Sequence, residues 1–307
     1  MNVKIHSFNE WDPLKQIVVG SAINANWPIN DPVFKQQSEE SKWTKTKMPE
    51  GPVPAEIIHQ TEDDLEKLCL TLEDLGVDVL RPNEMDFVER DGLYNYCPRD
   101  RLLIAGEKVV DPAMMYPCRD QEIEALDFVV ESAETITMPR DSDMILDAAN
   151  ICRLNDTWLC IEGKSGNFKA IEWLRNQFPE ISIYAYDFYA GVHIDSTIVP
   201  LNDHTVMLNA SRVTPDNCPE VFNDWEKIWI EDCVPRPFHR FPYASKWLGM
   251  NCLSVDPSTV IIDNMQKEII TLLEKKNFDV IPLELKHGRT LGGGFHCVTL
   301  DTWRQND

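Results

Sequence analysis

The stretch Leu102-Leu103-Ile104-Ala105-Gly106-Glu107-Lys108-Val109-Val110 decides the fold, because it holds two apolar strands on either side of a short polar turn. Short apolar runs bounded by turn residues predict buried strands. Helical spacing of apolar residues follows near 122–131, and a further strand pattern occupies 135–138. The stretch therefore predicts a unit in which two strands are followed by a helix and a third strand.

The same unit recurs along the chain, with its polar turns near residues 106, 155, 202 and 256, spaced 49, 47 and 54 residues apart. The remaining helices are expected near 62–75, 168–177, 219–225 and 265–276. The remaining strands are expected at 14–20, 77–80, 150–154, 158–161, 181–186, 196–201, 206–209, 227–230, 251–255, 260–263, 278–285 and 295–300, and the last completes the first unit.

A repeat of about 50 residues predicts modules that bury their apolar faces against one another. We therefore expect an α/β fold in which five ββαβ modules form one pseudo-fivefold ring, as a single domain over 1–307. The alternative is accidental spacing within an ordinary α/β protein. Residues 27–60, rich in Lys, Pro and Glu, are expected to be a long surface excursion.

Composition narrows the function. The chain has 29 basic and 51 acidic residues, a net charge of −22, which argues against nucleic acid or an anionic membrane as partner. It lacks an apolar run of about 18 residues and shows no targeting segment at its start. The nine cysteines are odd in number and contain no Cys-x-x-Cys pair. This favours reduced thiols in a cytoplasmic protein, one of which is available as a nucleophile.

Chemically active side chains stand at one place in each module, just before its first strand. The steps between them are 47, 46, 52 and 52 residues, and the set is Asp100, Asp147, His193 with Asp195, Ser245 and Cys297. In a ring, equivalent positions face the same axis. Each residue alone has an ordinary interpretation, since an Asp before a strand often forms a turn and a Cys in a strand is usually core.

Together these groups suit guanidinium chemistry. Carboxylates bind the planar guanidinium through paired hydrogen bonds, and a thiolate is a suitable nucleophile for its carbon. A substrate cation and an imidazolium would lower the thiol pKa. His193 is the expected acid/base, because His296, adjacent to Cys297 in a strand, would point to the opposite face. No zinc motif or phosphate loop occurs, so neither metal nor cofactor is expected.

At these residues the chain resembles the arginine:glycine amidinotransferases, which include inosamine-phosphate and cyanobacterial toxin-pathway amidinotransferases. The resemblance covers nearly the whole chain, and the segments that carry it are 97–100, 146–150, 193–197, 245–251 and 291–297. Gly292-Gly293-Gly294-Phe295-His296-Cys297 and His193-Ile194-Asp195 are highly specific together. The resemblance implies a pentein-type propeller of five α/β modules.

The resemblance also implies a role for each site residue. Cys297 corresponds to the nucleophile that carries the amidino group, His193 to the general acid/base, and Asp147 to the carboxylate that pairs with that histidine and the guanidinium. The substrate-binding positions it implies are Asp100, Asp195, Arg212 and Ser245. It places the acceptor pocket at Ala190 and Val192, where glycine-using vertebrate enzymes have larger residues.

The expected function is therefore transfer of the amidino group of L-arginine to a primary amine through an amidino-cysteine, with release of L-ornithine. The small residues of 190–192 favour an acceptor bulkier than glycine. A hydrolase that uses water in place of the amine is the alternative, and a catalytically silent propeller that binds arginine or a partner protein is a third. The expected partners are small-molecule substrates, and a homodimer stays open.

Overall fold

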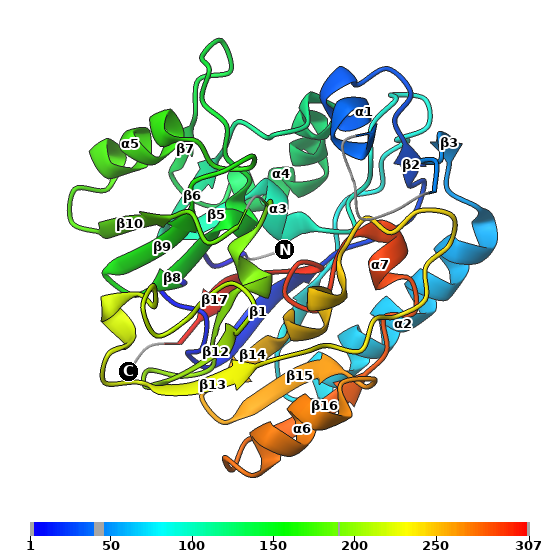
Figure 1. Cartoon of the computed structure of the whole chain (residues 1–307). Helices are drawn as coiled ribbons and strands as arrows, with labels where there is room; N and C mark the ends of the chain where they lie inside the picture. The colour runs from blue at the N-terminus through cyan, green and yellow to red at the C-terminus, as the bar shows by residue number, and fades with distance from the viewer. Residues whose placement is uncertain (1–2, 40–45, 190, 306–307) are drawn as a thin grey trace.

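The computed structural model describes residues 3–39, 46–189 and 191–305. Within these ranges the chain forms five three-stranded sheets and one two-stranded sheet (Figure 1). In every three-stranded sheet the central strand pairs antiparallel with one neighbour and parallel with the other. The repeated strand arrangement predicted from the sequence is therefore confirmed in all five sheets.

The strands follow the predicted repeat closely. The first sheet joins the two ends of the chain, because β1 (Leu14–Val19) lies between β17 (Thr299–Arg304) and β4 (Asp78–Leu80). Figure 1 shows β17 beside β1. The other four are β5 (Leu103–Ala105), β6 (Lys108–Asp111) and β7 (Thr135–Thr137); β8 (Ile151–Leu154), β9 (Thr157–Ile161) and β10 (Ser182–Tyr186); β11 (Ile198–Pro200), β12 (Thr205–Asn209) and β13 (Glu226–Ile230); and β14 (Leu253–Asp256), β15 (Thr259–Asp263) and β16 (Asp279–Leu283). The two-stranded sheet pairs β2 (Asn26–Trp27) with β3 (Gly51–Pro52).

Helical segments connect the second and third strands of each unit. They are α2 (Ala55–Asp74), η1 (Pro117–Leu126) with α4 (Asp127–Val130), α5 (Phe168–Gln177), η4 (Glu220–Phe222) and α6 (Lys267–Glu274). The α5 helix starts where predicted because the Asn167 side chain accepts a hydrogen bond from the Ala170 N–H. None of the helices in the described parts of the chain is both long and apolar enough to cross a bilayer.

One helix prediction was wrong, and a second was confirmed only in part. The segment expected to be a helix at 219–225 is only the short 3₁₀ turn η4, since Phe222 is its one buried side chain and no apolar stripe exists to hold a helix. The segment at 122–131 is helical in two forms, since 122–126 belong to the 3₁₀ helix η1 and Asp127–Val130 form the α-helix α4. In η1 the buried residues Arg119, Glu122 and Ala125 repeat every three positions, the period of a 3₁₀ helix, and Leu126 is buried beside them.

The expected strand at 295–300 begins later, at Thr299. Residues 295–298 form a turn instead. Gly292 adopts φ +92°, which ends α7 (Gly288–Leu291), and a Cβ on Gly294 would lie 2.7 Å from the Asn251 Cβ. These glycines therefore let the chain pack closely and turn before the strand starts, so His296 and Cys297 are not on opposite faces of a strand.

The excursion predicted at 27–60 is only partly a surface feature. It contains α1 (Pro32–Glu39) and the start of α2, and its side chains Trp27, Phe34, Val53 and Ile57 are buried in an apolar cluster with β1. The segment was predicted to lie on the surface because of its high content of Lys and Glu, although these widely spaced apolar residues are buried.

Five apolar clusters hold the sheets together, and each contains side chains from two of the three-stranded sheets. The β1 sheet shares one cluster with the β5–β7 sheet and another with the β14–β16 sheet. The β8–β10 sheet shares clusters with the β5–β7 and β11–β13 sheets, and the β11–β13 and β14–β16 sheets share the last one. The short segments that precede the first strands are packed among these clusters.

Candidate active site

The predicted site residues stand on short turns in front of strands. Asp100 lies in α3 (Pro98–Arg101), and Asp147, His193 and Ser245 directly precede the 3₁₀ turns η2 (Ala148–Asn150), η3 (Ile194–Ser196) and η5 (Lys246–Met250). Cys297 lies in the turn that leads into β17. Each turn starts a strand of a different sheet, so the repeat brings five distant segments to one place.

His193 lies between two carboxylates. Its Nε2 is 3.1 Å from Asp147 Oδ2, and its Nδ1 is 3.7 Å from Asp100 Oδ1. Burial opposes the charged imidazolium, but the carboxylates of Asp100, Asp147 and Asp195 outweigh it and raise the pKa of His193 to about 9. The imidazole is therefore protonated at neutral pH and is ready to act as an acid.

Asp147 is held rigidly in front of His193. Its Oδ1 accepts a hydrogen bond from the Met115 backbone N–H at 2.8 Å, and its own N–H donates to the Ser165 carbonyl at 2.8 Å. The Ser165 hydroxyl in turn donates to the Val192 carbonyl, next to His193. The same residue therefore ties the Asp147 turn to the His193 turn, which fixes the pair.

The Cys297 thiol is enclosed by polar partners. It donates to Asp195 Oδ2 at 3.2 Å and receives a hydrogen bond from Asn251 Nδ2 at 3.1 Å. Burial raises the pKa of the thiol well above its usual range, and the charge of Asp195 adds to the effect. Without a substrate cation the nucleophile is thus a neutral thiol. Any lowering of its pKa has to come with the substrate.

Asn251 is a site residue that the sequence did not single out. Its Oδ1 accepts the backbone N–H groups of His296 at 2.9 Å and Cys297 at 3.1 Å, while its Nδ2 reaches the thiol. Only its place in the segment 245–251, which carries the family resemblance, pointed toward it. Asn251 therefore sets the position of the sulfur atom.

Arg119 is a second residue missed from the sequence. Its Nη1 donates to Asp100 Oδ2 at 2.7 Å, and its remaining nitrogens bind the carboxylate of Glu122. Burial raises the pKa of Glu122 to about 7, against the opposing pull of Arg119. No sequence pattern marks a buried Arg–Glu pair, because such residues are usually exposed.

With one oxygen of Asp100 bound to Arg119, the other stays open. Asp100 Oδ1 is buried and has no hydrogen-bond partner among the described residues. A buried acceptor without a donor is costly, so this oxygen is suited to receive an N–H group from a ligand. Across the described ranges, no group of three His, Cys, Asp or Glu side chains has the arrangement of a metal site.

Arg212 lies on the wall of the cavity that leads to Cys297. Its guanidinium stacks 3.7 Å from the centroid of the Tyr189 ring, and its Nη1 donates to Thr197 Oγ1 at 2.7 Å. The Tyr189 hydroxyl donates to the His193 carbonyl at 2.6 Å, so Tyr189 joins the arginine to the histidine turn. Ser245 lines the same cavity, where its hydroxyl accepts from the Trp247 N–H.

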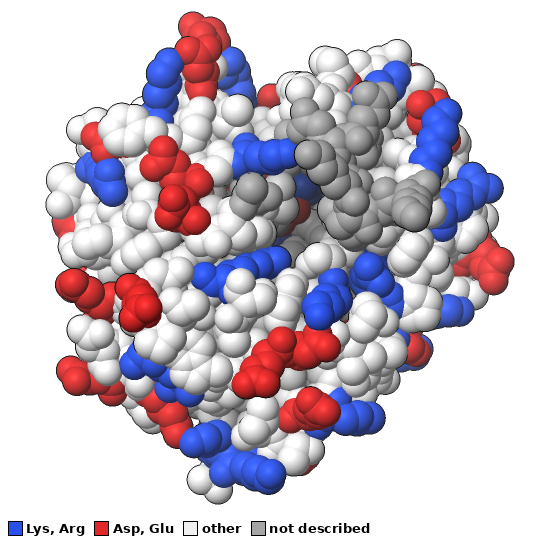
Figure 2. Space-filling view, in the orientation of Figure 1, with Lys and Arg blue, Asp and Glu red and all other residues white. Residues whose placement is uncertain are grey.

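The cavity has a volume of about 770 Å³, and both His193 and Cys297 open into it. Of the two predicted acceptor-pocket residues, Val192 lies on its wall, whereas Ala190 is outside the described residues. The predicted excursion contributes Phe34 and Met48 to the opposite part of the lining. Figure 2 shows Lys and Arg side chains around a hollow in this face, and the basic residues of the lining are Lys164, Arg212, Lys246 and Arg289.

Comparison with known proteins identifies the class. No family model matches the chain. The chain is 35% identical to inosamine-phosphate amidinotransferase 1 of Streptomyces glaucescens, over 98% of this chain and 97% of that protein. It is 28% identical to the mitochondrial glycine amidinotransferase of Xenopus tropicalis, over 97% of this chain and 82% of that protein.

Solved structures agree with the sequence comparison. The inosamine-phosphate amidinotransferase of Streptomyces griseus superposes with a TM-score of 0.91 at 32% identity, covering 99% of this chain and 98% of that one. The chain therefore belongs to the amidinotransferase family that contains the inosamine-phosphate and glycine amidinotransferases. It is an enzyme, and a transferase.

The fold extends beyond transferases. The N-terminal domain of an arginine dihydrolase from cyanobacteria superposes with a TM-score of 0.69 at 12% identity, covering 94% of this chain and 98% of that domain. At this identity the likeness concerns the α/β fold of the pentein class alone.

Proposed function

We propose that this enzyme takes the amidino group of L-arginine onto Cys297, releases L-ornithine and passes the group to a primary amine. The observation that carries the proposal is that the Cys297 thiol, the His193 imidazole and the Asp195 carboxylate line one cavity, while the carboxylates of Asp100 and Asp147 contact His193 from behind the wall. The site is rich in carboxylates, which favours a bound cation, and Asp100 Oδ1, 3.7 Å from His193 Nδ1, has no hydrogen-bond donor among the described residues. A guanidinium supplies both, in fork geometry.

The first half-reaction follows from the charges. The entering guanidinium offsets the negative field that keeps Cys297 neutral, so the thiol releases its proton to solvent in the cavity, from which a proton returns at the end of the cycle, and the sulfur attacks the guanidinium carbon. The carbon–nitrogen bond to the ornithine side chain then breaks. Its electron pair goes to the departing nitrogen, which takes the proton of His193 and leaves as an amine. The amidino group stays on the sulfur.

The second half-reaction reverses these roles. His193, now neutral, takes a proton from the incoming amine, whose nitrogen attacks the amidino carbon. The carbon–sulfur bond breaks, the sulfur keeps the electron pair, and the thiol regains a proton. Arginine and an amine are thus converted to ornithine and a guanidino compound, and the protein alone carries the intermediate.

The cavity suggests the kind of acceptor. Its volume of about 770 Å³ exceeds what arginine and glycine together need. Arg212 is assigned to the carboxylate of arginine, which leaves Lys164, Lys246 and Arg289 on the wall. An amine larger than glycine, with an anionic group, fits this lining, and the relatives named for inosamine phosphate support the same choice.

We also propose that the five sheets are modules of one closed pseudo-fivefold propeller and that residues 1–307 are a single domain. The five apolar clusters support this arrangement, since they link the sheets in a cyclic order that returns to β1. All nine cysteines are unpaired, which supports a reducing, cytoplasmic location. A homodimer that binds only small-molecule substrates is part of the proposal.

Isotope exchange tests the proposed function. Labelled ornithine, incubated with unlabelled arginine and the enzyme, should yield labelled arginine without any other amine, because ornithine is an acceptor in the reverse half-reaction. With arginine alone, little urea should form, since the closed site keeps water from the amidino-cysteine, and little citrulline or ammonia should form, since ornithine and not ammonia is the leaving group. Steady citrulline or ammonia formation without label exchange would assign the enzyme to the hydrolases.

A further inference from the structure

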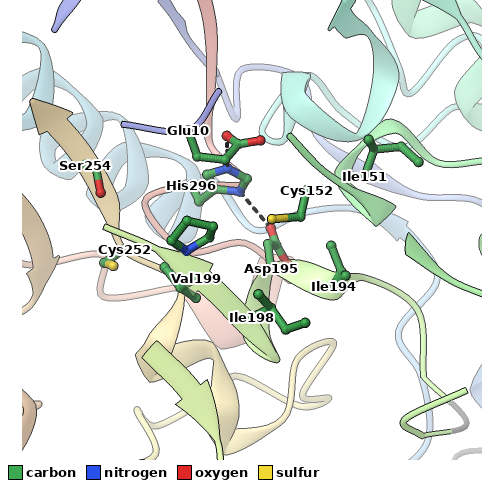
Figure 3. Close-up of a pocket in the computed structure, with 11 residues that line it drawn as sticks. Glu10, Ile151, Cys152, Ile194, Asp195, Ile198, Val199, Cys252, Ser254 and His296 are labelled. Carbon is green, nitrogen blue, oxygen red and sulfur yellow. Dashed lines mark hydrogen bonds and ion pairs between the residues drawn. The ribbon is translucent and has the colours of Figure 1, made fainter. Parts of the chain in front are cut away.

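A second histidine joins two buried carboxylates next to the nucleophile. His296 Nδ1 lies 3.0 Å from Asp195 Oδ2, and its Nε2 lies 3.2 Å from Glu10 Oε2. Figure 3 shows the ring between these two side chains, with a dashed line on each side. The side chains of Glu10 and Asp195 are 6% and 7% exposed, and that of His296 is 12% exposed. The three groups therefore form a buried row that starts in the interior and ends at the active site.

One oxygen atom links this row to the reaction. Asp195 Oδ2 receives both the His296 Nδ1 contact and the Cys297 thiol, the latter at 3.2 Å. Ionised carboxylates only accept hydrogen bonds, so both contacts of His296 are hydrogen bonds when both of its ring nitrogens carry a proton. Contact with His296 helps to hold the pKa of Asp195 below its usual range in spite of burial. The contact with His296, on the side away from the cavity, therefore favours the ionised form of the Asp195 carboxylate that faces the thiol.

The far end of the row is anchored. Arg153 donates to Glu10 Oε1 from its backbone N–H and its Nε, each at 3.0 Å, and to Oε2 from its Nη2 at 3.0 Å. Arg153 also binds Asp301 at 2.8 Å, and Arg99 approaches Glu10 at 3.5 Å. With Glu10 fixed by a bidentate arginine, the imidazole cannot rotate without losing a hydrogen bond at each nitrogen.

We propose that Glu10 and His296 are positioning residues, which hold the Asp195 carboxylate at the distance and angle that align the Cys297 sulfur with the guanidinium carbon. The inference rests on the proposed function. Asp195 would touch both reactants, the thiol and the guanidinium, so a small rotation of its carboxylate would misplace one relative to the other. Misplacement by about 1 Å can cost on the order of 100-fold in rate.

Among the described residues, no side chain other than His296 and the thiol itself is placed to orient the Asp195 carboxylate. The charged or titratable groups near His296 and Asp195 in the described residues are Glu10, Arg99, Asp100, Cys152, Arg153, Tyr189, His193, Arg212, Cys297, Asp301 and Arg304. Of these, only Cys297 and His296 make a side-chain hydrogen bond to Asp195 among the described residues. Removal of the imidazole contact therefore frees the carboxylate.

Two substitutions of His296 distinguish the loss of its hydrogen bond to Asp195 from the loss of the imidazole ring itself. In His296→Asn the side-chain NH₂ occupies the place of Nδ1 and keeps a donor toward Asp195, whereas in His296→Gln it lies near the place of Nε2 and faces Glu10. Both replace the imidazole ring with an uncharged amide. We expect kcat for His296→Gln to fall about 10- to 100-fold, the effect of one lost hydrogen bond to a charged group. We expect kcat for His296→Asn to stay within about threefold of the wild type.

Each variant is measured at its own pH optimum, with the KM for arginine recorded beside kcat. The KM should change little, since the guanidinium still meets Asp100 and Asp147. Equal losses of kcat in the two variants, or an unchanged kcat in His296→Gln, would overturn the positioning role.

Folding is checked by circular dichroism and thermal unfolding. If His296→Gln fails to fold, the Glu10→Gln variant is used in its place. This substitution removes the carboxylate charge that contacts His296 Nε2 and leaves the residues that meet substrate intact. A fall in kcat with a constant KM is expected there, and an unchanged kcat would likewise overturn the proposal. A wild type that lacks the arginine–ornithine exchange would instead refute the proposed function, which keeps the two failures distinct.

Discussion

The imidazole of His193 meets the carboxylate of Asp147 at 3.1 Å, although 46 residues of sequence separate them. A carboxylate that accepts from one ring nitrogen fixes the orientation and the protonation of the other, as in hydrolase triads. Cys297 has its own carboxylate, Asp195, at 3.2 Å across 102 residues. The acid/base and the nucleophile are therefore oriented by separate acidic partners.

Replacement of Cys297 by alanine should abolish turnover and leave the fold intact, because no amidino-enzyme can form. Mass spectrometry of wild-type enzyme after incubation with arginine should detect a labile adduct on Cys297. Cys218→Ala is a suitable control, since Cys218 is half-buried and outside the cavity lining. An adduct on a different cysteine would contradict the assignment of the nucleophile.

Asp147→Asn should lower kcat by far more than it lowers stability. The substitution keeps the side-chain shape and removes the charge that orients His193. Loss of the orienting carboxylate costs about 10⁴ in kcat in serine proteases, and we expect a large loss here as well. Steady-state kinetics and chemical unfolding of the same preparation give the comparison. Near-normal turnover would show that Asp147 does not orient the acid/base.

The pH dependence should follow His193. Because the carboxylates raise its pKa to about 9, the imidazolium needed by the leaving amine is lost only above that pH, and kcat/KM for arginine should decline there. The declining limb should move to lower pH in Asp147→Asn, which removes one of the charges responsible. A limb that stays at the same pH in the variant would assign it to another group.

Stability should depend on the same titration. A histidine whose pKa is raised from 6.5 in the unfolded chain to about 9 in the folded protein stabilises the fold fully below pH 6.5, and loses this contribution as pH rises through about 9. The free energy of unfolding should therefore fall over this window by on the order of a few kcal/mol more in the wild type than in His193→Asn. Urea unfolding at pH 6 and pH 9.5 measures the difference.

Arg212→Lys should weaken the recognition of arginine. Lysine retains the charge, but it cannot stack on Tyr189 and reach Thr197 in the same planar arrangement. We expect kcat/KM for arginine to fall about 10- to 100-fold, while that for agmatine, which lacks the carboxylate, should change little. Arg175→Lys on α5, away from the cavity lining, is the control. Equal losses for both substrates would place Arg212 in a purely structural role.

Val192→Met should change the choice of acceptor. The side chain of Val192 lies on the cavity wall and is 37% exposed, so a longer residue reduces the room beside His193. The kcat/KM of bulky amines should fall relative to that of glycine, whereas the initial burst of ornithine from arginine should persist. Rapid-quench measurement of the burst and a panel of amines test both halves. An unchanged acceptor profile would remove Val192 from the acceptor pocket.

Much of the fold and part of the candidate site were readable from the sequence. Three features are visible in the sequence itself: the strand pattern, the spacing near 50 residues and the polar residue before each first strand. They can therefore be recognised without knowledge of the packing. The place of Cys297, His193, Asp100, Asp147 and Asp195 followed from that spacing. Their meeting in the structure is a consequence of the repeat.

Other parts depended on the tertiary structure alone. Arg119 and Asn251 carry no pattern, because a buried polar side chain is marked only by the partner that satisfies it, and that partner lies elsewhere in the chain. His296 was expected to face away from Cys297, as alternate residues of a strand do. The glycines before it and the Asn251 side chain turn the chain instead, and this brings both side chains to Asp195. Sequence period thus determined the repeated units, whereas close packing between distant segments decided the direction of each side chain.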